Sequence, residues 1–224
     1  MSYHFEFGWL LQYYPDIIKG IVITLELIAV GGVLGISLGI FCAWVRALGP
    51  AWLKPVVAAY VELIRNTPFL IQLFFIFFGL PSIGLHLSEL TAANLAMVVN
   101  LGAYSCEIIR AGIQATPKGQ FEAGESLAMT RFETFRHVVL VPSLQRIWPA
   151  LSSQVVIVML GSSVGSQIPP QKSDLCPKLH TVPKPSAPFE AYIVSTAIYL
   201  TLAILLRQVL AVIGGLIFPR RAAL

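Results

Sequence analysis

Five polar side chains stand out because they lie inside long apolar stretches of the sequence. They are Glu26, Gln72, Asn100, Glu107 and Gln154. Burying a polar or charged side chain in lipid is costly, so such residues normally face the interior of a helix bundle or a water-filled path. Their chemistry would be the coordination of a polar solute at membrane depth. These five residues are therefore candidates for a translocation path.

A structural role is the alternative for the charged members of this group. Glu107 precedes Arg110 by three residues, which is the spacing of an ion pair on one face of a helix. Glu62 and Arg65 show the same spacing. Glu26 is expected close to the outer membrane interface, where a carboxylate can reach water. On this interpretation the charges support the bundle and do not contact a solute, and the two roles stay open.

Enzyme chemistry has little support in the sequence. The four histidines are dispersed, at His4, His86, His137 and His180. Cys42 and Cys106 lie in apolar segments and Cys176 is isolated, so no spacing resembles a zinc site or a disulfide framework. The phosphate-binding pattern G-x-x-x-x-G-K-[ST] does not occur. A membrane-embedded enzyme would need paired carboxylates or a histidine-rich metal cluster, and the sequence offers neither.

Composition indicates that lipid is the main solvent of this chain. Of its 224 residues, 56% are hydrophobic and only 12% are charged. The net charge of +4 comes from scattered residues and forms no basic patch of the kind that binds nucleic acid. A spanning helix needs about 20 mostly apolar residues, and the apolar blocks are too long and continuous for the strands of a membrane barrel. The blocks lie near 20–45, 57–80, 91–114, 147–168 and 190–217.

The sequence thus predicts an all-α integral membrane protein with about five transmembrane helices in a single domain over residues 1–224. The start of the chain lacks the pattern of a cleaved signal peptide, so the first span is expected to remain as an anchor. Short cytoplasmic loops retain Lys and Arg, and an N-out, C-in arrangement leaves few basic residues outside. The outer residues are Lys19, Lys172, Lys178 and Lys184. The cytoplasmic ones are Arg46, Lys54, Arg65, Arg110, Lys118, Arg131, Arg136, Arg146, Arg207, Arg220 and Arg221.

Three glycines in the first span predict a close helix contact. Gly31, Gly35 and Gly39 recur every four residues and line one face of a helix. Small residues at this spacing let two helix backbones approach each other in lipid. General glycine enrichment of membrane helices is the alternative, but the regular spacing favours a specific packing face.

The longest polar connection, about 115–145, has the character of a folded surface element. Pro117 introduces a break, and residues 121–130 mix apolar, small and acidic residues as a short surface helix would. Apolar residues at helical spacing over 132–139 predict a second helix. An exposed Leu127 beside small residues suits docking into a groove of a partner better than contact with water alone.

The same connection resembles the EAA loop of ABC importer permeases. The similarity is carried by Glu122-Ala123-Gly124, Leu127-Ala128 and Val138-Val139-Leu140. The family motif reads Glu-Ala-Ala, three residues, Gly, nine residues, then Ile-x-Leu-Pro. This chain has Gly124 at the third position, Ala128 in place of the Gly, and Pro142 one residue later than the motif. The spacing of the motif is otherwise kept.

Two further stretches resemble the polar amino acid branch of these permeases, the histidine/glutamine-type permease family. One is Tyr60-Val61-Glu62-Leu63-Ile64-Arg65-Asn66-Thr67-Pro68, before the span that contains Gln72. The other is Glu107-Ile108-Ile109-Arg110-Ala111-Gly112-Ile113. The resemblance covers nearly the whole chain except about 169–188.

The resemblance implies a fold like that of ABC type I importer permeases and a function in moving polar amino acids across the bacterial inner membrane. It implies that a second permease subunit, identical or similar, a dimer of P-loop ATPases and an external solute-binding protein are the partners. This chain would bind no cofactor, since ATP and Mg would lie on the ATPase. The ATPase-coupling residues would be Glu122, Ala123, Gly124, Leu127 and Ala128. A channel or membrane scaffold is the competing function, but no pore motif is evident.

The segment 169–188 departs from the rest of the sequence. It contains six prolines and three lysines and shows no helical period. One interpretation is an extended external loop, which proline tolerates in polyproline II geometry. The other is a local frameshift, because codons for 174–184 exist that spell family-like text when read one base later. The frameshift hypothesis implies a chain that inserts and assembles but transports poorly.

Overall fold

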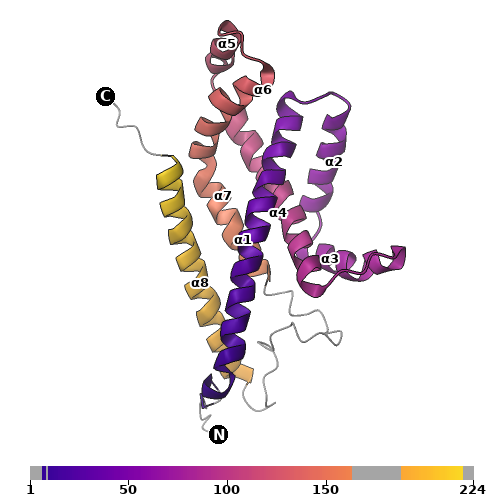
Figure 1. The fold of residues 1–224 in the computed structure, drawn as a ribbon, viewed down its shortest axis with the longest axis vertical. Coiled ribbons are helices and arrows are strands. Elements are labelled where there is room, and N and C mark those ends of the chain that lie inside the picture. The colour runs from indigo at the N-terminus through magenta and orange to yellow at the C-terminus, as the bar shows by residue number, and fades with distance from the viewer. Residues whose placement is uncertain (1–6, 9, 163–187, 219–224) are drawn as a thin grey trace.

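The computed structural model describes residues 7, 8, 10–162 and 188–218, and this part of the chain is helical without strands. The segment 169–187, with its two interpretations, lies outside the described residues. The long helices run roughly parallel to the longest axis of the molecule (Figure 1). They are α1 (Leu10–Leu48), α2 (Leu53–Arg65), α4 (Glu89–Gln114), α7 (Val141–Ser162) and α8 (Pro188–Ile217).

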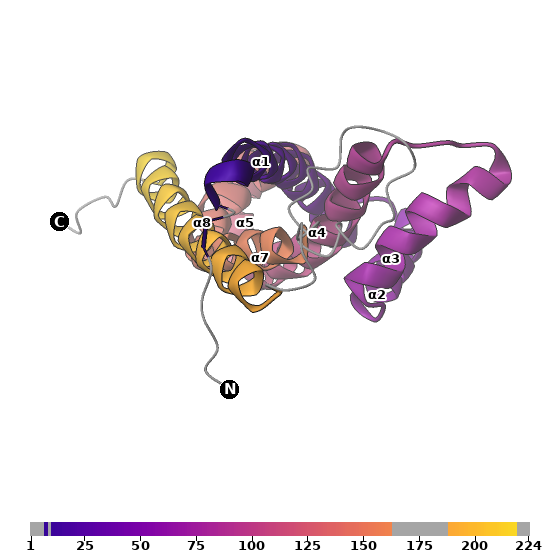
Figure 2. The ribbon, with the colours of Figure 1, turned by 90° about the horizontal axis from the view of Figure 1, so that it is seen from below.

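The shorter elements connect these helices. They are α3 (Phe69–Phe74), the π-helical η1 (Phe75–Gly79), the 3-10 turn η2 (Leu80–Ile83), α5 (Lys118–Ser126), α6 (Arg131–Glu133) and the π-helical η3 (Thr134–Leu140). Figure 2 shows α8 and the α2–α3 region on opposite sides of the bundle, with α1, α4 and α7 between them.

Three described helices are long and apolar enough to cross a membrane. They are Tyr13–Leu48, Glu89–Gln114 and Phe189–Ile217, and they correspond to the first, third and fifth expected spans. The fourth expected span, 147–168, is described only as far as the end of α7 at Ser162. The helix α1 starts at Leu10, before the expected position 20, and ends at Leu48, where Gly49 and Pro50 follow. A proline so close to the end lacks the N–H that would continue the helix.

The second expected span, 57–80, is not one continuous helix, which corrects the prediction from sequence. It is a pair of helical segments, Leu53–Arg65 and Phe69–Ile83, and the chain bends by 109° at the break between them. The physical reason is Pro68, because a proline disfavours helical geometry in the residue before it and removes a backbone donor. With this pair taken as one span, the described residues hold up to four candidate spans by length and composition.

The contact between α1 and α4 forms the centre of the bundle. A side chain at Gly35 would place its Cβ atom 2.9 Å from Leu101 Cβ, and one at Gly39 would place it 2.5 Å from Ser105 Cβ. Gly31 lies in the same way against Met97. The predicted packing face of the three glycines is therefore confirmed, and its partner is α4.

We expect Gly39→Val to destabilise the bundle and Gly32→Val to be tolerated. A valine at Gly39 must push α4 away, and overpacking of this kind costs about 1–3 kcal/mol. A side chain at Gly32 would meet no atom within 4 Å, so it is a matched control on the same helix. Thermal unfolding of both variants in mild detergent measures the difference. Equal unfolding midpoints would show that the close approach at Gly39 does not limit stability.

The ends of the helices divide into two groups. The helix α1 begins at the end of the molecule opposite α5, whereas α8 ends on the α5 side (Figure 1). This arrangement agrees with a loop 115–145 that lies on the same side of the membrane as the end of the last span. Which side faces the cytoplasm stays a prediction from the Lys and Arg distribution.

Candidate functional site

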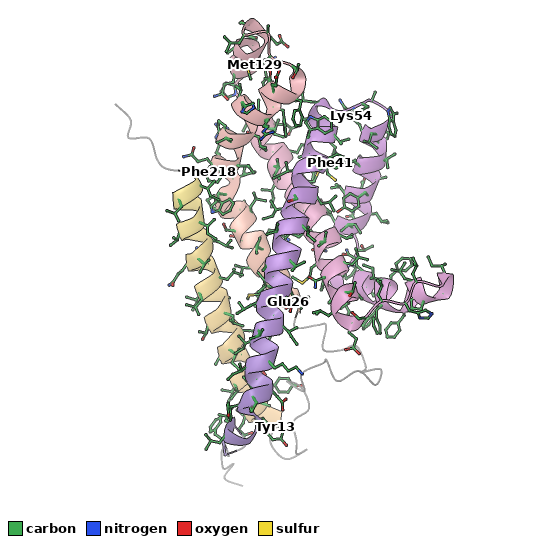
Figure 3. The ribbon with its side chains drawn as sticks, in the orientation of Figure 1. Tyr13, Glu26, Phe41, Lys54, Met129 and Phe218 are labelled. Carbon is green, nitrogen blue, oxygen red and sulfur yellow. The ribbon has the colours of Figure 1, made fainter. Side chains whose placement is uncertain are left out.

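The connection between α4 and α7 folds into a projecting helix–turn–helix, which we name the shelf and define as residues 118–140. Its first helix, α5, runs from Lys118 to Ser126, so it begins and ends earlier than the expected 121–130. Its second part is α6 followed by η3, which continues into α7. Figure 3 shows Met129 at the far tip of the molecule, beyond the ends of α1 and α8.

The shelf presents an apolar and acidic outer surface. Leu127 is 74% exposed, Phe132 is also exposed, and Glu122 and Ala123 on α5 face outward as well. An apolar side chain of this size gains nothing from water, and its exposure on a projecting tip suits a partner groove. The structure thus places the predicted residues Glu122, Ala123 and Leu127 at an accessible surface.

Gly124 is buried, and this position has a packing reason that sequence did not reveal. A Cβ atom at Gly124 would lie 2.6 Å from Thr134 Cγ2 and 2.7 Å from Thr134 Oγ1. The absence of a side chain therefore lets α5 pack closely on η3. Glycine in a helix costs about 1 kcal/mol relative to alanine, and the close contact of α5 with η3 offsets this cost.

Ala128 ends α5 in a conformation that favours glycine. Its φ angle is +54°, and it is the one non-glycine residue with positive φ in the described part of the chain. The Ala128 N–H donates to Glu125 O at 2.9 Å and the Met129 N–H donates to Gly124 O at 3.1 Å, which together form a Schellman motif. The left-handed conformation costs about 1–2 kcal/mol for a residue that has a Cβ atom.

We therefore expect Ala128→Gly to stabilise the shelf by about 1 kcal/mol. Ala123→Gly is the matched control, because Ala123 is an exposed interior residue of the same helix and its change to glycine should destabilise by about 1 kcal/mol. Hydrogen exchange of residues 118–134 measures both effects. A slower exchange in Ala128→Gly and a faster one in Ala123→Gly is the expected result, and the same sign in both would contradict it.

The second half of the shelf begins with a capping box that sequence reasoning missed. The Thr130 N–H donates to Glu133 Oε2 at 2.8 Å, and the Glu133 N–H donates to Thr130 Oγ1 at 3.3 Å. The Thr130 hydroxyl also donates to Glu133 Oε2 at 2.7 Å, and the two bonds that Thr130 donates to this carboxylate lower the pKa of Glu133. Folding lowers the pKa of the Glu133 carboxyl group, so the ionised carboxylate stabilises the folded chain at neutral pH. This stabilisation is lost as the pH falls through the pKa that Glu133 has in the folded chain. The Thr-x-x-Glu spacing was the available signal.

Polar contacts hold the end of α4 and the start of α7 together at the base of the shelf. Thr116 Oγ1 and Ser143 Oγ lie 3.0 Å apart, and both are buried. The Ser143 hydroxyl also donates to Gly112 O at 3.3 Å, and Arg146 Nη1 donates to Ala115 O at 3.1 Å. The two chain segments that carry the shelf are therefore fixed to each other by polar contacts.

Glu107 lies at the centre of a charge cluster that joins three helices. It accepts a hydrogen bond from Arg110 Nη2 at 2.7 Å, which confirms the predicted pair within α4. It also pairs with Arg46 of α1, and its Oε2 lies 3.8 Å from Arg65 Nη1 of α2. The Arg65 guanidinium stands 5.6 Å from the centroid of the Tyr104 ring. One carboxylate thus faces three guanidinium groups, an excess of two positive charges.

A cleft of about 380 Å³ opens beside this cluster. Glu107, Arg46, Arg65, Glu62, Asn66 and Tyr104 line it together with apolar residues. Glu62 is exposed and belongs to none of the ion pairs in the described part of the chain. The cleft therefore offers carboxylate, guanidinium and amide groups within one space.

Gln72 and Asn100 meet each other at the break between α2 and α3. Both are buried, and Asn100 Nδ2 donates to Gln72 Oε1 at 3.0 Å. Gln72 Nε2 in turn donates to Ile64 O at 2.7 Å and to Thr67 O at 2.9 Å, where the break leaves helix carbonyls without partners. These two side chains therefore hold the bent span together.

The remaining two candidates stay apart from these groups. Glu26 is exposed on α1, and Figure 3 places it well away from the shelf along this helix. Gln154 is half-buried on α7. Neither forms a polar contact with Gln72, Asn100 or Glu107 in the described structure. The five polar residues are thus divided among a pair, a charge cluster and two separate positions.

Comparison with known proteins finds one family that covers most of the chain. Residues 35–220 match the family described as "Binding-protein-dependent transport system inner membrane component". The L-cystine transport system permease protein TcyB of Bacillus subtilis is 36% identical over 157 residues, which cover 70% of this chain and 67% of that protein.

Solved structures agree with this match. A chain in the crystal structure of an amino acid ABC transporter with histidines is 32% identical and has a TM-score of 0.80, with 95% of this chain and 99% of that chain covered. A chain of the inward-facing MetNI methionine ABC transporter has a TM-score of 0.70, again with 95% of this chain and 99% of that chain covered. Its sequence is 17% identical, so this match supports the fold alone.

Proposed function

The chain belongs to the binding-protein-dependent transport system inner membrane component family, and from this premise we propose that it is the membrane-spanning permease subunit of an ATP-binding-cassette importer for polar amino acids. The amino acid class follows the relatives, which include a cystine permease and an amino acid ABC transporter. The bacterial inner membrane is the proposed location.

The shelf is the observation that carries this proposal. It projects beyond the helix bundle, it exposes Leu127 and Glu122, and the ends of α4 and α7 that carry it are held together by polar contacts. A surface of this kind suits a cytoplasmic partner that applies force to the bundle. Since the sequence has no P-loop, we assign ATP and Mg to a separate ATPase dimer and no cofactor to this chain.

We assign ATPase coupling to two kinds of shelf residue. Glu122, Ala123 and Leu127 would contact the ATPase directly. Gly124 and Ala128 would fix the shape of α5, the first through close packing on Thr134 and the second through the turn that ends the helix. A second permease subunit and an external solute-binding protein would complete the importer.

The translocation path is proposed to include the cleft beside Glu107. Its carboxylates could receive the ammonium group of an amino acid, and its arginines the carboxylate. Gln72 and Asn100 would shape the path by holding the break between α2 and α3, and Glu26 and Gln154 would line it elsewhere. Transport then requires that the outward-open and inward-open states make different contacts with the ATPase. Movement of the shelf would reach the cleft through α4, which carries Glu107.

Purification of the tagged full-length chain from its native membrane in mild detergent tests the proposal. We expect a P-loop ATPase and a second permease subunit among the co-purifying proteins. Membrane vesicles should accumulate labelled polar amino acids only when both ATP and a solute-binding protein are supplied. Amino acid passage that needs neither ATP nor an ATPase would instead support a channel.

A further inference from the structure

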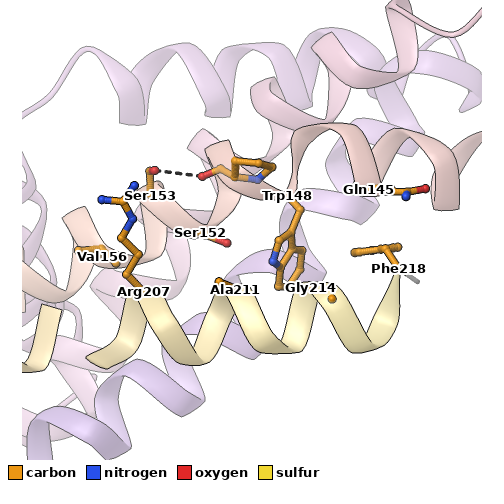
Figure 4. Close-up of a pocket in the computed structure, with 11 residues that line it drawn as sticks. Gln145, Trp148, Ser152, Ser153, Val156, Arg207, Ala211, Gly214 and Phe218 are labelled. Carbon is orange, nitrogen blue, oxygen red and sulfur yellow. Dashed lines mark hydrogen bonds between the residues drawn. The ribbon is translucent and has the colours of Figure 1, made fainter. Parts of the chain in front are cut away.

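A second and larger groove lies between α7 and α8, far from the cleft beside Glu107. Its volume is about 820 Å³. Its polar and aromatic lining residues are Gln145, Trp148, Ser152, Ser153, Arg207 and Phe218. In Figure 4 the Arg207 side chain extends from α8 toward the α7 side of this groove. None of the candidate residues from sequence takes part in it.

Arg207 is an uncompensated charge within a membrane-spanning helix. It is exposed, and it forms none of the ion pairs or hydrogen bonds found in the described part of the chain. The described residues that line the groove include no Asp or Glu. An arginine in this position is costly unless it meets a polar or anionic group.

The depth of Arg207 fits the headgroup region of one leaflet. The helix α8 has 30 residues and is about 45 Å long at about 1.5 Å per residue, whereas the hydrocarbon core is about 30 Å thick. With the helix centred, about 7 Å of it extends beyond the core at each end. Arg207 lies ten residues before the end at Ile217, so its Cα atom is about 8 Å inside the core boundary. A long arginine side chain can extend over this distance to the phosphate level.

The surroundings of Arg207 are two serines and an aromatic boundary. Ser152 Oγ is buried and has no hydrogen-bond partner. Ser153 Oγ donates to Pro149 O at 3.0 Å. Toward the end of the groove, Trp148 Nε1 donates to Leu210 O at 2.8 Å, and the rings of Trp148 and Phe218 lie 5.6 Å apart. Aromatic residues of this kind mark the membrane–water interface.

We propose that this groove binds the phosphate headgroup of an anionic phospholipid from the leaflet on the shelf side. The guanidinium group of Arg207 would pair with the phosphate in a charge-assisted hydrogen bond. The apolar walls of the groove, which include Val156 and Ala211, would receive the upper part of an acyl chain. A zwitterionic amino acid fits less well, because its ammonium group would find no carboxylate among the described lining residues.

The test measures which lipid stays bound to the full-length chain. The chain is reconstituted in vesicles with equal amounts of phosphatidylglycerol and phosphatidylcholine, extracted in mild detergent, and its retained lipids are measured by native mass spectrometry. We expect preferential retention of phosphatidylglycerol by about five-fold, the effect of one basic residue near an anionic surface. Arg207→Gln should abolish the preference and Arg207→Lys should retain most of it.

Arg136→Gln is the matched control, because Arg136 is an exposed arginine of the shelf outside the groove. It should keep the preference, and elution as a single species establishes that each variant is folded. Three results would overturn the proposal. The first is that Arg207→Gln retains as much phosphatidylglycerol as the unmodified chain. The second is that millimolar free amino acids displace the lipid, which would identify a solute carboxylate as the ligand. The third is that Ala211→Cys forms a disulfide between two copies of the chain, which would make the groove a subunit interface.

Discussion

Replacing Glu122 by Lys together with Leu127 by Asp is expected to abolish recovery of the ATPase with the purified chain. Leu127 is the most exposed large apolar residue on the shelf, and its burial in a partner groove would be lost when a charge takes its place. Loss of one such anchor costs about 2 kcal/mol or more, which corresponds to roughly thirty-fold weaker association. Reversal of the charge at Glu122 adds repulsion to that loss. Co-purification followed by quantitative mass spectrometry measures the change.

The control for this double variant is Trp52→Asp. Trp52 is 72% exposed in the connection between α1 and α2, so the control also replaces an exposed apolar side chain with an acid. We expect it to retain the ATPase in full. If Glu122→Lys with Leu127→Asp brings down as much ATPase as the unmodified chain, the shelf is not the docking surface. If both variants lose the ATPase, the effect is not specific to the shelf.

The regular spacing of residues within one helix was the part of the fold that sequence could predict. Gly31, Gly35 and Gly39 indicated a packing face, and α4 occupies that face with Met97, Leu101 and Ser105. The pair of Glu107 with Arg110 follows from the same local geometry. Such predictions succeed because 3.6 residues per turn fixes which side chains share a face before any tertiary contact forms.

The break in the second span had a local signal that hydropathy concealed. The residues on both sides of Pro68 are apolar enough to be taken as one span, yet the structure bends there by 109°. Proline permits either a kink or a complete stop, and the choice depends on partners for the freed carbonyl groups. Gln72 supplies those partners at Ile64 and Thr67 and is itself held by Asn100 of α4. A tertiary contact therefore decided a feature that the sequence left open.

The contacts of Glu107 beyond α4 could not be predicted at all. Arg46 precedes it by 61 residues, and the position of α2 that brings Arg65 near depends on how the helices pack. The role of Gly124 has the same origin, because only the packing of α5 on η3 reveals the contact with Thr134. In both cases the missing information was the arrangement of helices and not the properties of the residues.

We expect Glu107→Ala to be among the most destabilising single substitutions in this chain. The side chain of Glu107 is only 17% exposed, and its removal leaves the guanidinium groups of Arg46, Arg65 and Arg110 facing one another without a counter-charge. Removing one partner of a buried ion pair costs about 3–5 kcal/mol, and the partial exposure of the arginines places the expected loss near the lower value, about 3 kcal/mol. Thermal unfolding in mild detergent measures it.

Two further variants separate the charge cluster from the cleft that it lines. Glu62→Ala removes a carboxylate from the same cleft, but Glu62 is exposed and belongs to none of the ion pairs, so we expect a change within about 0.5 kcal/mol. Glu107→Gln combined with Arg46→Met should be more stable than Glu107→Ala, because Arg46 is removed together with its counter-charge and two guanidinium groups instead of three are left without one. If Glu107→Ala is no less stable than Glu62→Ala, Glu107 does not hold α1, α2 and α4 together. Reduced amino acid uptake in a Glu62→Ala variant of normal stability, together with the expected loss of stability in Glu107→Ala, would assign the exposed carboxylate of the cleft to solute binding and Glu107 to the framework around it.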